Sequence, residues 1–180
     1  MSYQYKRQPL TSEQLRAYEG AVDTMTDKLI TYTLVDLGLR VSELAGLQRV
    51  CVDWQGQRIT IFGKGGPYGR HSKRRVLPLT IRTAQVLGHV FSVCDRVKLS
   101  KRTIQRRVKS VARRAGLVCP VSPHVLRHTF AVNCLRRGVS LPTIMRLLGH
   151  ENLLTTQAYL NLSPEMVISE FREKFRDQVE

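Results

Sequence analysis

The chain has 180 residues, 42% of them apolar, and its 29 Lys and Arg against 14 Asp and Glu give a formal net charge of +15. This length suits one domain with a real hydrophobic core, and the sequence contains neither a membrane-spanning apolar run nor a signal-peptide pattern. A compact domain this basic is expected to bind a polyanion, most often nucleic acid, and we expect it in the cytoplasm without membrane contact.

The residue pattern of the N-terminal third predicts helices. Residues 1–9 are polar without periodicity and predict a leader. Thr11 is expected to cap a first helix, and apolar spacing predicts a second helix from about residue 26 to residue 37. The following segment LRVSELAGL predicts a short helix in which Arg40 and Glu43 lie three residues apart.

Three runs of alternating or β-branched residues come next, at 50–54, 58–62 and 75–79, and they predict a small antiparallel sheet. The loop between the second and third runs, GKGGPYGRHSKR, combines glycines with cations. Taken alone, this loop fits either a solvated turn or a flap that contacts phosphate.

Two more helices are expected after the sheet. Thr80 is a candidate cap for a helix ending near residue 94, and Ser100 for one ending near residue 115. The second helix combines one apolar side with a dense set of cations: Lys101, Arg102, Arg106, Arg107, Lys109, Arg113 and Arg114. So many cations on one helix repel each other unless an anion neutralises them, which favours a surface that faces DNA.

The segment 122–159 holds the side chains best suited to phosphodiester chemistry. Pro123 follows a capping serine at a predicted helix start, and one turn later His124 and Arg127 point the same way. A second helix is expected to end at a glycine just before His150, and Tyr159 follows nine residues later. A last helix, 163–178, carries an apolar stripe that packs either on its own domain or on a neighbouring copy.

These motifs together resemble the tyrosine recombinases, also called the phage integrase family. They read GLRVSEL, GKGG with RRVLPL, HVLRHTF and LGHENLLTTQAYL, in the order of the family's catalytic domain. The resemblance implies a mainly α (α+β) fold with a small three-stranded antiparallel sheet, forming one domain over residues 1–180. The family's N-terminal core-binding domain has no room here, so we expect either an excised catalytic domain or a naturally short recombinase.

The resemblance also implies six catalytic side chains and a supporting carboxylate: Arg40, Lys64, His124, Arg127, His150, Tyr159 and Glu43. Tyr159 would attack a DNA phosphodiester to form a 3′-phosphotyrosyl link and release a 5′-hydroxyl. Arg40 and Arg127 would grip the non-bridging oxygens, and Glu43 would orient Arg40 or its helix.

Proton transfer falls to the remaining groups. The resemblance implies that His124 assists the tyrosine proton and that His150 donates a hydrogen bond to the phosphate. Lys64 would protonate the leaving 5′-oxygen as general acid, with Lys73 as the alternative.

The family further implies double-stranded DNA as the partner, a homotetramer on synapsed DNA, a monomer in solution and a nucleoid-associated location. The expected DNA contacts are Lys73, Arg74, Arg75, Lys101, Arg102, Arg106, Arg107, Lys109 and Arg113. We expect no metal and no cofactor, because the four cysteines lack metal-ligand spacing and no carboxylate cluster for magnesium is visible. Two alternatives stay open: a type IB topoisomerase-like nicking-closing enzyme and a catalytically idle, basic DNA-binding regulator.

Overall fold

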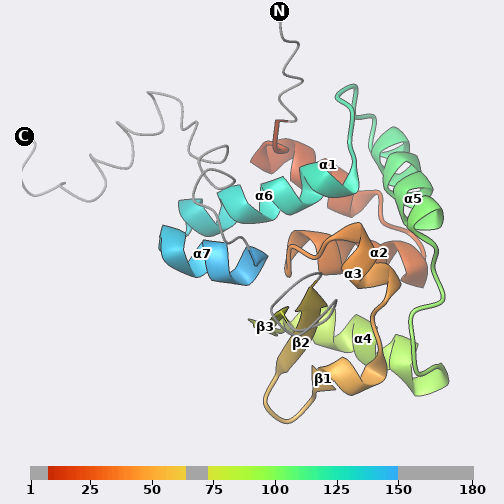
Figure 1. Ribbon diagram of the computed structural model, residues 1–180. Helices are drawn as coiled ribbons and strands as arrows, with labels where there is room; N and C mark the ends of the chain where they lie inside the picture. The colour runs from red at the N-terminus through yellow and green to blue at the C-terminus, as the bar shows by residue number, and fades with distance from the viewer. Residues whose placement is uncertain (1–7, 64–72, 150–180) are drawn as a thin grey trace, which may run out of the picture. The chain divides into compact units, whose positions relative to one another are not determined.

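Helices and a small sheet make up the computed structural model, which describes residues 8–63 and 73–149 (Figure 1). The leader, the loop with Lys64 and everything from residue 150 onward, including the expected last helix, lie outside these residues. The described elements are α1 (Ser12–Gly20), α2 (Met25–Val35), α3 (Val41–Ala45), the 3-10 turn η1 (Arg49–Cys51), β1 (Val52–Asp53), β2 (Arg58–Gly63), β3 (Lys73–Pro78), α4 (Ile81–Val93), α5 (Lys101–Arg114), α6 (Pro123–Arg136) and α7 (Leu141–Leu148). No helix in this part of the chain combines the length and apolarity that crossing a bilayer requires.

The helices begin where short polar side chains can satisfy the first free backbone N–H groups. The Thr11 hydroxyl accepts from the backbone N–H of Gln14 at 3.2 Å, and the Gln14 side chain accepts from the N–H of Thr11 at 3.0 Å. At the other three helices the hydroxyl of Thr80, Ser100 or Ser122 likewise accepts from the backbone N–H three residues ahead, so all four predicted caps are confirmed.

The sheet is antiparallel with the order β1-β2-β3, as the sequence predicts, but its ends differ from the predicted runs. Residues 49–51 form a 3-10 turn, which leaves only Val52 and Asp53 for the first strand. In β2 and β3, Ile59 pairs with Leu77 and Gly63 with Lys73, so β3 begins two residues earlier than expected. The mainly helical fold with a small three-stranded antiparallel sheet is confirmed.

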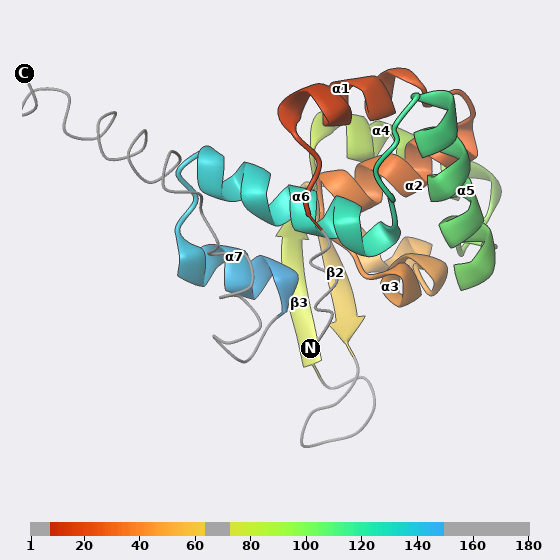
Figure 2. The same ribbon diagram turned by 90° about the horizontal axis from the view of Figure 1, so that it is seen from above.

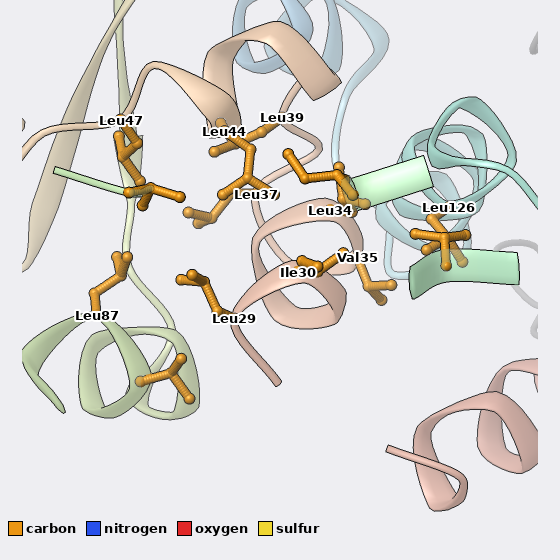
Figure 3. Close-up of a cluster of buried hydrophobic side chains, with 14 of the residues drawn as sticks. Leu29, Ile30, Leu34, Val35, Leu37, Leu39, Leu44, Leu47, Leu87 and Leu126 are labelled. Atoms are coloured by element: carbon orange, nitrogen blue, oxygen red, sulfur yellow. The ribbon is translucent and has the colours of Figure 1, made fainter. Parts of the chain in front are cut away.

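α2 lies at the centre and packs against α4, α5 and α6 (Figure 1). Its apolar residues are buried on several sides, as expected for a helix surrounded by others. Figure 3 shows this core, in which Leu29, Ile30 and Leu34 of α2 meet Leu44 from α3 and Leu126 from α6. α7 packs against α6 and lies beside β3 (Figure 2). This arrangement brings the start of α3, the strand β3 and the end of α7 together.

Candidate active site

The site is built on the entry to α3. Arg40 is the residue that precedes the helix, and Glu43 lies in its first turn. One carboxylate oxygen of Glu43 accepts from the backbone N–H of Arg40 at 2.6 Å, and the other accepts from Nη1 of Arg40 at 3.0 Å. Glu43 therefore caps the helix and fixes the Arg40 guanidinium beside it.

Arg127 reaches the same place from α6. Its side chain is 5% exposed, Nη1 donates to the carbonyl of Gly38, and Nη2 donates to the carbonyl of Leu148 at 2.5 Å. Nη1 also lies 3.9 Å from Oε2 of Glu43. The two motif arginines thus lie around the same carboxylate, that of Glu43.

A third arginine, Arg75 of β3, completes the cluster. Its Nη1 donates to Oε1 of Glu43 at 2.7 Å and its Nη2 to Oε2 at 2.8 Å, in a two-pronged ion pair. We expected Arg75 to contact DNA, but its side chain is turned inward and is only 10% exposed. A signal for this is present in the strand: Val76 is exposed and Leu77 buried, and alternation puts Arg75 on the face of Leu77.

These contacts determine the charge of the site. Burial alone would raise the pKa of the Glu43 carboxyl, but the hydrogen bonds and charge of Arg75, with those of Arg40, hold that pKa at about 2. The carboxylate is therefore ionised at neutral pH. Around it, Arg40, Arg75 and Arg127 leave a net charge of two positive units, which favours an anion.

The end of α7 is held by the same side chains. Three successive carbonyls at that end, those of Leu147, Leu148 and Gly149, accept hydrogen bonds from Arg75, Arg127 and Arg40 respectively. The last carbonyls of a helix lack partners within the helix and carry the negative end of its dipole, so guanidiniums suit them. The chain is thereby fixed in the arginine cluster at Gly149, one residue before His150.

His124 is exposed in the first turn of α6, three residues before Arg127, while its neighbours in that turn are buried. It lines a hollow of about 590 Å³ with Val41, the residue after Arg40, and with Gln105 and Lys109 of α5. The structure therefore places His124 on the side of the molecule that carries the start of α3 and the basic helix. The other predicted catalytic residues, Lys64, His150 and Tyr159, lie outside the described residues, and of Lys73 only the backbone at the start of β3 is described.

The cations of α5 divide into two groups. One group is exposed on the solvent side of the helix: Lys101, Arg102, Arg106, Lys109 and Arg113. Arg107 and Arg114, whose side chains are 38% and 39% exposed, also donate to the fully buried carboxylate of Asp27, at 3.4 and 2.6 Å. Arg107, which we expected to contact DNA, is thus partly committed within the protein. On β3, Arg74 is exposed.

Comparisons with known proteins show which chains this one is similar to. Residues 8–166 match the phage integrase family. The chain is 33% identical over 179 residues to tyrosine recombinase XerC of Chlamydia trachomatis serovar L2, covering 88% of this chain and 55% of that protein. It is 34% identical over 168 residues to tyrosine recombinase XerA of Pyrococcus horikoshii, covering 86% of this chain and 56% of that protein. The chain thus spans about half the length of the curated relatives it matches.

Solved structures show the same fold. A crystal structure of XerA recombinase aligns with a TM-score of 0.77 at 28% identity, covering 93% of this chain and 65% of that chain. The XerH site-specific recombinase bound to palindromic difH substrate, a post-cleavage complex, aligns with a TM-score of 0.73 at 19% identity, covering 92% of this chain and 53% of that chain. At that identity the second likeness concerns the fold alone.

Proposed function

The chain belongs to the phage integrase family, and we propose that it forms the part of a site-specific tyrosine recombinase that cuts and rejoins DNA. One observation carries the proposal. Arg40 and Arg127, from two separate family motifs, meet around Glu43 and leave excess positive charge beside the end of α7. A phosphate group is an anion that planar, two-pronged guanidinium donors match in charge and in geometry.

In the proposed reaction the phenol oxygen of Tyr159 attacks the phosphorus, and the bond between phosphorus and the 5′-oxygen breaks. His124 assists removal of the phenol proton, which is needed because an unperturbed tyrosine has a pKa of about 10. Lys64 donates a proton to the leaving 5′-oxygen, while the arginines and His150 stabilise charge on the non-bridging oxygens. The covalent link keeps the bond energy, so that the reverse reaction rejoins the strand without ATP or metal.

Double-stranded DNA is the proposed partner. The exposed cations of α5, among them Lys109 in the hollow beside His124, extend positive charge from the arginine cluster along one helix. Such a surface binds the phosphate backbone by releasing counterions and makes affinity fall with salt. Assembly as a homotetramer on two synapsed duplexes, monomers in solution and a nucleoid-associated location in the cytoplasm are parts of the same proposal.

A covalent-capture experiment tests the proposal and identifies the target site at the same time. The chain is incubated with a pool of randomised duplexes, each nicked close to the randomised region so that the released short strand diffuses away. Complexes that survive denaturing detergent are isolated and their DNA is sequenced. The proposal predicts SDS-resistant adducts enriched in one sequence, and no adducts from Tyr159→Phe.

The alternatives predict other results. Salt-sensitive DNA binding without any adduct would favour an idle DNA-binding regulator. Adducts without sequence enrichment, together with relaxation of any supercoiled plasmid, would favour a topoisomerase-like enzyme. Adducts that persist in Tyr159→Phe would refute the assignment of the nucleophile.

A further inference from the structure

Arg75 uses most of its hydrogen-bonding capacity inside the protein. Its Nη1 and Nη2 donate to the two oxygens of Glu43 at 2.7 and 2.8 Å, and its Nε donates to the carbonyl of Leu147 at 2.7 Å. The side chain is 10% exposed, whereas that of Arg40 is 38% exposed. Of these two guanidiniums, Arg40 is therefore the one open to an incoming anion.

The space beside Arg75 is closely matched to it. Gly149 has a φ of +64°, and a Cβ built there would lie 3.2 Å from both Cδ and Nη1 of Arg75. Glycine at position 149 thus allows the arginine to pass over the end of α7. Because Arg75 belongs to β3 and Glu43 to α3, this one side chain links three separate elements.

Removing Arg75 would change the partner of the Glu43 carboxylate. Glu43 is 5% exposed, and its nearest remaining cations are Arg40 at 3.0 Å and Arg127 at 3.9 Å. A nearly buried carboxylate that has lost its two-pronged partner is costly, so it would draw Arg40 from a single side-chain contact into a two-pronged pair. Arg40 would then be occupied by Glu43 and less available to a phosphate.

We propose that Arg75 is a positioning residue, which holds both oxygens of Glu43 and thereby keeps the guanidinium of Arg40 open to the DNA phosphate. This inference rests on the proposed function, because it assumes that Arg40 binds phosphate. It assigns different roles to two arginines of one cluster: Arg40 contacts the substrate, and Arg75 acts through Glu43.

The test is a titration of the ¹⁵N-labelled chain with inorganic phosphate at constant ionic strength, followed through the arginine Nε–H signals. We expect the Arg40 signal to move and the Arg75 signal to stay. Arg75→Gln should weaken phosphate binding about tenfold, and Glu43→Gln added to Arg75→Gln should return the affinity to within about threefold of the parent. Arg58→Gln is the matched control. It also removes one arginine from an ion pair with a carboxylate in the same sheet, but that pair, Arg58 with Asp53, is exposed.

Each outcome either supports or overturns the role of Arg75. A parent chain whose Arg40 signal ignores phosphate would refute the phosphate site itself, and the inference with it. A moving Arg40 signal with an equally moving Arg75 signal would show that Arg75 contacts phosphate directly and would overturn the positioning role alone. The positioning role would also be overturned if the double variant bound phosphate no better than Arg75→Gln. It would be overturned likewise if Arg58→Gln bound phosphate as weakly as Arg75→Gln. If Arg75→Gln does not fold, Arg75→Lys replaces it in the test, because lysine keeps a charge beside Glu43. Its affinity for phosphate should be lower than that of the parent chain, by less than about tenfold.

Discussion

Replacing Gly149 by alanine tests whether the end of α7 is as tightly matched to Arg75 as the structure indicates. Gly138 supplies the control, because it too has a positive φ, +77°, but a Cβ built there meets nothing within 4 Å. An L-residue in this left-handed conformation costs about 1 kcal/mol. That cost applies to both positions, so any difference between the two variants reports the contact with Arg75.

The size of that difference follows from the contacts. A Cβ at position 149 lies 3.2 Å from Cδ and Nη1 of Arg75, so the arginine side chain must give by a few tenths of an ångström, which weakens its hydrogen bonds to Glu43 and to the Leu147 carbonyl. Hydrogen bonds to charged groups are worth about 1.5–3 kcal/mol, and weakening them adds roughly 1–2 kcal/mol. We therefore expect Gly138→Ala to lower the free energy of unfolding by about 1 kcal/mol and Gly149→Ala by about 2–3 kcal/mol.

Urea unfolding measures both values. With a slope of about 2 kcal/mol per molar urea, the midpoint should fall by about 0.5 M for Gly138→Ala and by about 1–1.5 M for Gly149→Ala. Covalent capture should be impaired in Gly149→Ala and unchanged in Gly138→Ala. Equal midpoints for the two variants would refute the argument that Arg75 fills the space over Gly149.

Three further predictions concern other parts of the structure. Since the folded-state pKa of Glu43 is held at about 2, its stabilising contribution is present above the ordinary glutamate pKa of 4.5 and is lost as pH falls through 2. Between these two pH values, the free energy of unfolding of Glu43→Gln should depend less steeply on pH than that of the parent chain. An equally steep pH dependence in the variant would contradict the ion pairs assigned to Glu43. In a plot of the logarithm of the DNA-binding constant against the logarithm of salt concentration, Arg106→Ala should reduce the slope by about one unit. Arg114→Ala should leave that slope nearly unchanged, because the Arg114 guanidinium pairs with Asp27. Equal changes of slope in filter-binding measurements would count against the division of the α5 cations. Leu126→Ala should cost about 2–5 kcal/mol in urea unfolding, because Leu126 is fully buried where α6 meets the core, and a loss below about 1 kcal/mol would contradict that packing.

Helix starts can be predicted from the sequence because they depend on neighbours. Thr11 and Ser122 each accept from a backbone N–H three residues ahead, and such a contact follows from residue type and spacing alone. The first strand is shorter than its residue types predict, because where a strand begins is not determined by neighbouring residues alone. Val50 is β-branched, but in the fold it belongs to the 3-10 turn before β1 and is exposed.

The arginine cluster is only partly predictable. Arg40 and Arg127 are found through their motifs, whereas Arg75, a cation in a strand beside a basic loop, has the sequence context of a DNA contact. Its partner Glu43 lies 32 residues away along the chain, so no local pattern connects them. The pairing of Arg107 with Asp27 is unpredictable for the same reason, since Asp27 is 80 residues distant.

The central claim is that Tyr159 becomes covalently linked to DNA, and peptide mapping of the captured adduct tests it most directly. After nuclease and trypsin digestion, cleavage at Arg146 and Arg172 releases the peptide 147–172. Of the six tyrosines in the chain, this peptide contains only Tyr159. We predict that mass spectrometry will find the nucleotide remnant on that peptide, at Tyr159. A remnant on any other residue, or an adduct that alkali cleaves as it would a serine ester, would contradict the account.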